Sequence, residues 1–139
     1  MTNLIPWNCR GLMNKRDEIW DIISDYQPII FAHQETYLKR TDKVTFHGYN
    51  CFRKDFRHSE RATGGIALLN SNDFPYTVIS FYINIRALAE QIHIHQIACT
   101  IYLASNFFNR ITKIISLCNY SPLLSFLVTL MPIALLGES

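Results

Sequence analysis

The chain has no Cys-x-x-Cys pair, because its four cysteines lie far apart, at Cys9, Cys51, Cys99 and Cys118. It therefore lacks the paired-cysteine spacing that indicates a zinc or redox site. The first residues also lack the order of basic, apolar and small residues that is typical of a secretory signal peptide. We therefore expect reduced, mostly buried thiols in a nuclear or cytoplasmic protein.

Net charge is also small, since 13 basic and 11 acidic side chains leave +2 at pH 7. A global field of this size does not require nucleic acid as the partner. Internal repeats and low-complexity segments are lacking as well, so we expect a single domain over residues 1–139. Hydrophobic residues make up 49% of the chain, which is enough to drive collapse around a core.

Two apolar runs, each ending in polar residues, are the most informative feature that is present. The first is Leu4 to Trp7, which ends at Asn8, and the second is Pro28 to Ala32, which is soon followed by Glu35. Between them, Met13 to Tyr26 repeats apolar residues at helical spacing. This order predicts a strand, a helix and a parallel strand, which brings Asn8 and Glu35 to one edge of a sheet. Open α/β sheets bind ligands at that edge.

An amide and a carboxylate at such an edge are suitable ligands for a hard cation. Mg2+ prefers oxygen ligands and often takes only one or two carboxylates from a protein. Composition alone also allows the alternative that neither residue binds a metal: Asn8 would cap a turn, and Glu35 would be exposed to solvent.

Several short motifs occur in an order that is typical of one family. The string WNCRGL stands at residues 7–12 and QET at residues 34–36. Later motifs are FHGY at residues 46–49 followed by Arg53 and Asp55, GGIALL at 64–69, TIYL at 100–103 and LLGE at 135–138. Together they resemble the endonuclease/exonuclease/phosphatase family, and most closely the N-terminal endonuclease domain of jockey-type non-LTR retrotransposons.

This resemblance implies an α/β fold, a four-layer sandwich of two facing mixed sheets with outer helices, of which the chain would supply the N-terminal half. It also implies a Mg2+-dependent endonuclease, with Mn2+ as an alternative cofactor, that nicks duplex DNA at a target site. Asn8 resembles the active-site asparagine, Glu35 the metal-binding glutamate, and Tyr102 the tyrosine that contacts the scissile phosphate. Tyr120 is a second match for that tyrosine, because residues 117–120 resemble the same motif.

The sequence departs from the family pattern at two places. Arg10 stands where the repair branch of the family has an aspartate, which agrees better with the retrotransposon branch. LLGE is an imperfect start of the family's Gly-Asp-x-Asn motif, and the later Asp/His pair that supplies the general base is absent. A general base contributes roughly 10²- to 10⁴-fold in rate, so we expect an inactive fragment of the enzyme. A non-catalytic relic of the element is the alternative.

Basic residues gather in one part of the chain, between the turns at Gly48 and Gly64. They are interleaved with aromatic rings and include Arg53, Lys54, Arg57 and Arg61. Such a loop could lie along a DNA backbone. A solvated hairpin connection explains the same charges.

The stretch from Ile114 to Leu136 carries no charge over about the length that spans a bilayer. Pro122 and Pro132 fall inside it, so we expect a buried helix followed by a strand and consider a membrane unlikely as a partner. A small membrane-associated protein remains a further alternative. Other strands are expected near Tyr49 to Arg53, Gly65 to Leu69, Tyr76 to Tyr82 and Ala89 to Leu103.

Overall fold

A computed structural model describes residues 4–58, 61–62, 64–81, 86–105, 112–121 and 124–130. The four-stranded sheet has the order β1-β2-β6-β3, and the five-stranded sheet has the order β11-β10-β9-β8-β7. Two strands of two residues each, β4 and β5, pair to form a small third sheet. The strands of the four-stranded sheet are β1 (Leu4–Asn8), β2 (Ile30–Gln34), β3 (Tyr49–Lys54) and β6 (Ile66–Ser71). The other strands are β4 (Arg57–His58), β5 (Arg61–Ala62), β7 (Tyr76–Ile79), β8 (Ala87–Ile94), β9 (Ile97–Ser105), β10 (Thr112–Ser121) and β11 (Leu124–Leu130).

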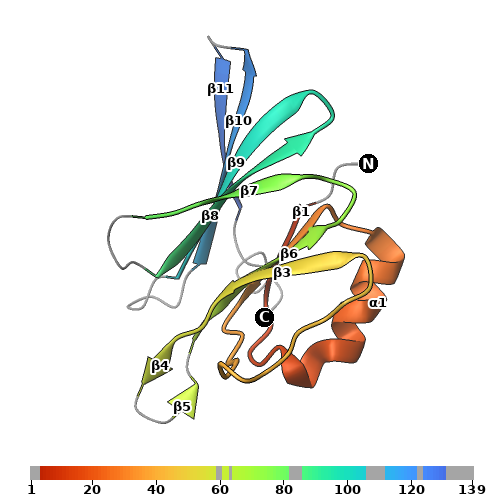
Figure 1. Ribbon diagram of the computed structural model, residues 1–139, viewed down its shortest axis with the longest axis vertical. Coiled ribbons are helices and arrows are strands. Elements are labelled where there is room, and N and C mark those ends of the chain that lie inside the picture. Colours follow the sequence, from red (N-terminus) through yellow and green to blue (C-terminus); the bar gives the residue numbers. More distant parts are fainter. Residues whose placement is uncertain are drawn as a thin grey trace.

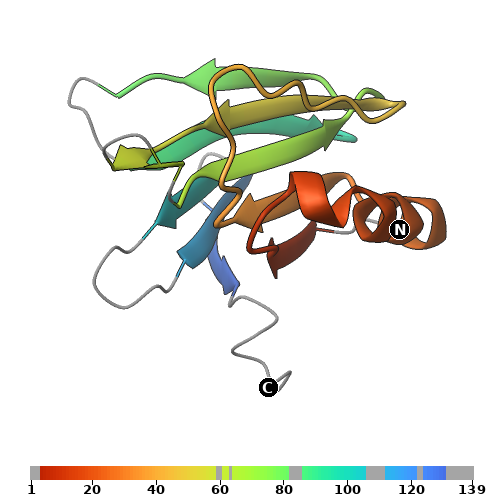
Figure 2. The ribbon, with the colours of Figure 1, turned by 90° about the horizontal axis from the view of Figure 1, so that it is seen from below.

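The predicted strand, helix and parallel strand are present at the start of the chain. β1 pairs with β2 in parallel, and Asn8 is the register partner of Gln34. The connection contains the 3-10 turn η1 (Met13–Lys15) and the helix α1 (Arg16–Tyr26). Asp17 and Glu18 lie in the first turn of α1, where negative charge complements the helix dipole. Figures 1 and 2 show α1 lying next to this sheet.

Two hydrophobic clusters hold three layers together among the described residues. On one face of the four-stranded sheet, Ile19 and Ile23 of α1 are buried with Phe31 and Leu69. The opposite face packs against the five-stranded sheet, and this second cluster joins Ile30, Ala32, Ile66 and Leu68 to Leu88, Ile92, Ile101 and Leu103. Alternate residues of β2 and β6 therefore serve opposite faces, as expected for strands covered on both sides.

The α/β class and the two sheets agree with the sequence-based expectation. The described residues form a layer of helix followed by two layers of sheet, and they provide no helix on the outer face of the five-stranded sheet. The fourth layer of the expected sandwich is thus not seen in the described ranges.

The helix expected after Ile114 is wrong. Thr112–Ser121 and Leu124–Leu130 form the antiparallel strands β10 and β11, and β10 also pairs with β9. Adjacent β-branched residues at Ile114 and Ile115 favour a strand, and β10 ends at Ser121, just before a proline in the sequence. Residues 131–136 lie outside the described part. Within the described part, every helix is too short or too polar to cross a membrane.

Candidate functional site

The structure brings Asn8 and Glu35 to one edge of the four-stranded sheet, as the strand order predicts. Asn8 ends β1, Gln34 ends β2, and the two are register partners. Alternation along β2 puts Gln34 on the face that bears Ala32, which packs toward the five-stranded sheet. The candidate site therefore begins with two amide side chains on the inner face of the sheet, and Glu35 follows directly.

Backbone hydrogen bonds hold three connections together at this edge. The N–H of Gly11 donates to the carbonyl of Glu35 at 2.8 Å, and the N–H of Leu12 donates to the carbonyl of Thr36 at 2.9 Å. The N–H of Thr36 in turn donates to the carbonyl of Gly65 at 3.3 Å. The loops after β1 and β2 and the loop before β6 thus form one connected unit around the candidate site.

Left-handed backbone conformations are concentrated in the same three loops. Arg10, Glu35 and Tyr37 have φ of 48°, 51° and 51°, values that non-glycine residues rarely adopt. At Gly65, with φ of 92°, an added Cβ would collide with Oγ1 of Thr36. Strained residues cluster where a fold has to hold side chains in set positions, and such clustering supports a functional role for this edge.

Several polar atoms at this edge are buried and have no hydrogen-bond partner among the described residues. They are Oδ1 of Asn8, both amide atoms of Gln34, and Oγ1 of Thr36. Most buried polar atoms in folded proteins are paired, so an orphaned group indicates a polar ligand, an ion or a water. These atoms provide the oxygen-rich environment that a hard cation prefers.

Glu35 contributes the negative charge. Its side chain is 20% exposed, and its Oε2 lies 3.7 Å from Nε of Arg10. The side chain of Arg10 is 75% exposed, so solvent screens the pair and the interaction is weak. Arg10 therefore engages the Glu35 carboxylate only weakly.

His33 and Cys9 lie next to the site but are poorly suited to acid–base chemistry. His33 is fully buried, and its ring centroid lies 4.1 Å from that of Phe31. Burial lowers the pKa of His33 to about 3. The Cys9 thiol donates to the carbonyl of Gln34 at 3.3 Å, and burial raises its pKa to about 12. Both side chains are therefore neutral at pH 7.

Tyr102 is not brought into this arrangement. It lies on β9 between Ile101 and Leu103, which both belong to the core between the sheets. Alternation puts Tyr102 on the outer face of the five-stranded sheet, whereas Asn8 and Gln34 occupy the inner face of the other sheet. The other match, Tyr120, lies in β10 at a register shift, and its side chain lies outside the described part.

The predicted basic loop is only partly available for DNA. Arg53 pairs with Asp55 at 3.3 Å and donates to the carbonyls of Lys39 and Arg40, so its guanidinium is used within the fold. Lys54 ends β3, in register with Ile66. Arg57 and Arg61 lie on the two-residue strands β4 and β5, and their side chains lie outside the described part.

One buried acidic residue was missed by the sequence reasoning. Glu90 is fully buried on β8, between Leu88 and Ile92, which face the first sheet. Its position in the alternating pattern of residues 87–94 was the available signal, because Glu90 shares the parity of these two apolar residues.

In the described part of the chain, no group of three or more His, Cys, Asp or Glu side chains is placed to hold a metal ion. Any cation at the edge of β1 and β2 would thus rest on Glu35, amide oxygens and ligands from outside the protein. Comparisons of the chain with protein-family models, curated proteins and solved structures found no match.

Proposed function

We propose that the edge formed by Asn8, Gln34 and Glu35 is part of a Mg2+ site in a DNA endonuclease domain of the retrotransposon type. The observation that carries the proposal is the buried Oδ1 of Asn8, which has no hydrogen-bond partner in the described part of the chain and lies on the strand next to the one that Glu35 follows. The order of motifs along the chain points to the same two residues. On this proposal the two sheets are the first half of a four-layer α/β sandwich.

The residues present fit the proposed cation. Within the described ranges, Asn8 and Gln34 offer amide oxygens that have no partner, and Glu35 offers a carboxylate that pairs with the exposed Arg10. A site with one carboxylate suits Mg2+, which keeps several waters and takes further oxygens from a phosphate. Mn2+ accepts the same oxygen ligands and serves as a probe.

Each side chain has a definite task in this proposal. Glu35 and Asn8 hold the ion, and the bound ion would neutralise phosphate charge and orient the attacking water. We assign three residues of the basic segment to the DNA backbone: Lys54 at the end of β3, Arg57 and Arg61. Arg53 is assigned a structural task instead, because Asp55 and two carbonyls engage it.

The described residues provide no efficient general base at this edge. His33 is neutral, buried, and on the helix-facing side of the sheet. Because general base catalysis contributes roughly 10²- to 10⁴-fold, we propose that these residues bind a divalent cation and duplex DNA but cut DNA slowly.

The experiment is Mn2+ binding to the full chain, followed by electron paramagnetic resonance, with Glu35→Gln and the control Glu18→Gln. Glu18 is an exposed carboxylate on α1 that pairs with Lys15. We expect Glu35→Gln to weaken Mn2+ binding at least tenfold, about the loss of one ion–ligand interaction, and Glu18→Gln to leave it unchanged. Equal binding by all three proteins would contradict the proposal.

A non-catalytic relic is the second candidate, and the ion pair between Arg10 and Glu35 favours it. A guanidinium 3.7 Å from the only carboxylate proposed for the ion provides a partner that needs no metal. The two candidates differ in DNA binding measured by fluorescence anisotropy. Mg2+-dependent binding that is lost in Glu35→Gln supports the endonuclease, whereas binding that ignores Mg2+ supports the relic.

A further inference from the structure

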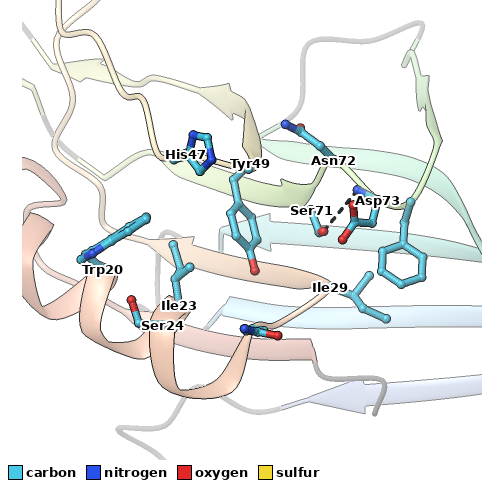
Figure 3. A pocket seen from close by; sticks show the side chains of 12 residues that line it. Trp20, Ile23, Ser24, Ile29, His47, Tyr49, Ser71, Asn72 and Asp73 are labelled. Atoms are coloured by element: carbon cyan, nitrogen blue, oxygen red, sulfur yellow. Dashed lines mark hydrogen bonds between the residues drawn. The ribbon is translucent and has the colours of Figure 1, made fainter.

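A cavity lies at the opposite end of β2 from Glu35. It has a volume of about 590 Å³ and is lined by Trp20, Ile23, Ser24, Gln27, Ile29, His47, Gly48, Tyr49, Ser71, Asn72, Asp73 and Phe74 (Figure 3). The wall thus combines the last turns of α1, the residue before β2, the start of β3 and the turn after β6. This volume lies within the range of small-molecule sites in proteins, which is about 300–1,000 Å³.

Aromatic rings dominate one part of the wall. Trp20 lies on α1 but not on its buried face, and the residue is 43% exposed, which leaves its indole available to a ligand. The hydroxyl of Tyr49 donates to the carbonyl of Pro28 at 2.6 Å, so the phenol is fixed in place. In the view of Figure 3, Tyr49 lies between Trp20 on one side and Asp73 on the other.

The charge of the wall is negative. Asp73 is the only Asp or Glu among the described lining residues, and none of these is Lys or Arg. Burial raises the pKa of the Tyr49 phenol, and the negative charge of Asp73 raises it further. A cavity with this charge attracts cations and repels phosphate.

The backbone also offers little to an anion. Main-chain N–H groups could form an anion cradle, but those of several lining residues are already bonded within the protein. They are the N–H groups of Gln27, Tyr49, Ser71, Asn72 and Phe74, which donate to the carbonyls of Ile23, Phe46, Ile29, Gly48 and Ser71, and the N–H of Asp73, which donates to the Ser71 hydroxyl. The main-chain N–H groups of these six lining residues are therefore not available to an anion.

We infer that this cavity binds a small organic cation bearing a methylated ammonium group, held by Trp20 and Tyr49 with Asp73 as its counter-charge. Aromatic faces attract such cations through the ring quadrupole, and a nearby carboxylate adds to the attraction. The site shares no residue with Asn8, Gln34 or Glu35, so it stands whether or not the endonuclease proposal holds.

The test is a nuclear magnetic resonance titration of the full chain with choline and with its neutral isostere 3,3-dimethyl-1-butanol. The chain has two tryptophans, so the indole N–H of Trp20 reports on the cavity and that of Trp7, which stacks on Phe31, serves as the internal control. We expect choline to shift the Trp20 signal in a saturable way and the neutral alcohol to bind several-fold more weakly. Equal binding of the two compounds, or no saturable shift with choline, would overturn the inference.

Two variants locate the cation. Asp73→Asn keeps the shape of the residue, and loss of an exposed ion pair should weaken choline binding up to about fivefold. Asp25→Asn, an exposed carboxylate on α1 outside the cavity lining, is the matched control and should bind choline like the parent protein. Inorganic phosphate should leave Trp20 unchanged. An Asp73→Asn protein that binds choline as tightly as the parent, or a Trp20 shift caused by phosphate, would show that the cavity does not select cations.

Discussion

Nδ2 of Asn70 donates to Oε2 of Glu90 at 2.7 Å, and this hydrogen bond joins β6 of one sheet to β8 of the other. Both residues are fully buried. Oδ1 of Asn70 and Oε1 of Glu90 have no partner in the described part of the chain, so the pair has two free acceptors and lacks a donor. A proton on Glu90 supplies that donor. Burial accordingly raises the pKa of Glu90 to about 7, although the bond from Asn70 works in the opposite direction.

Glu90→Gln should therefore make the protein more stable at pH 8 and change little at pH 4. The pKa of Glu90 rises from 4.5 in the unfolded chain to about 7 on folding, so its stabilising contribution is complete below pH 4.5 and is lost as pH rises to 7. At pH 8 the gain should approach about 3 kcal/mol, because each pKa unit corresponds to about 1.4 kcal/mol. Urea unfolding of the variant and the parent protein between pH 4 and pH 8 measures this difference in the free energy of unfolding. Glu18→Gln, at an exposed position, is the control, and a Glu90→Gln gain that stays constant with pH would contradict the prediction.

His33→Phe should reveal how Glu90 makes the free energy of unfolding depend on pH. In the parent protein, His33 masks this dependence. Burial lowers the pKa of His33 from 6.5 to about 3, so His33 makes the protein less stable as pH falls through that range. Between about pH 4.5 and 6.5 the two residues act in opposite directions, and the parent protein should show a nearly flat stability profile.

His33→Phe removes the contribution of His33 and places a third aromatic ring beside Phe31 and Trp7. The free energy of unfolding should then fall between pH 4.5 and 7 by about 1.4 kcal/mol per pH unit. At pH 7 the variant should be roughly 1 kcal/mol more stable than the parent, since it removes two buried nitrogens that lack partners among the described residues. A profile that stays flat in His33→Phe would show that Glu90 does not retain its proton on folding.

The first part of the fold could be predicted from the sequence because its pattern is unambiguous. Apolar runs that end at Trp7 and Ala32, with a helical repeat between them, predict a parallel pair with a crossover, and this pair brings Asn8 and Glu35 to one edge. The strand expected from Gly65 to Leu69 also agrees with β6 (Ile66–Ser71) within two residues at each end. Parallel topology thus predicted that Asn8 and Glu35 share an edge, and the order of the motifs selected the two residues as a candidate site.

The remainder depends on contacts that single-sequence patterns do not encode. The uncharged stretch after Ile114 fits a helix or a strand by hydrophobicity, and pairing with β9 decides for a strand. Arg53 was expected to contact DNA, but whether a guanidinium meets solvent or the carbonyls of Lys39 and Arg40 is decided by the course of a loop. The cavity beside Trp20 combines four segments that are separate in sequence, so no local motif could indicate it.

Gly65→Ala should destabilise the protein more than Gly48→Ala. Both glycines have left-handed φ values, 92° and 83°, so alanine pays a similar backbone cost of about 1–2 kcal/mol at each. A Cβ at Gly48 meets nothing within 4 Å, whereas at Gly65 it collides with Oγ1 of Thr36. The collision should add about 1–3 kcal/mol.

The second substitution Thr36→Ala tests the origin of that difference. It removes the colliding hydroxyl, and Oγ1 of Thr36 has no hydrogen-bond partner among the described residues to lose. In a double-mutant cycle measured by thermal unfolding, Thr36→Ala should recover most of the extra loss caused by Gly65→Ala and none of that caused by Gly48→Ala. Simple additivity in both cycles would show that Thr36 does not constrain the backbone at Gly65.

Arg10→Asn should strengthen Mn2+ binding rather than weaken it. If Glu35 holds the proposed ion, Arg10 competes for it, because Nε of Arg10 lies 3.7 Å from Oε2 of Glu35. Asparagine tolerates the left-handed backbone at this position, where φ is 48°. Removing an exposed ion pair should improve Mn2+ affinity by up to about fivefold. Lys43→Ala, which removes an exposed positive charge elsewhere, controls for the change in net charge. The gain should disappear when Glu35→Gln is also present, because the competition then has no carboxylate. If Arg10→Asn instead weakened Mn2+ binding, Arg10 would hold the carboxylate in place for the ion and would not compete with it.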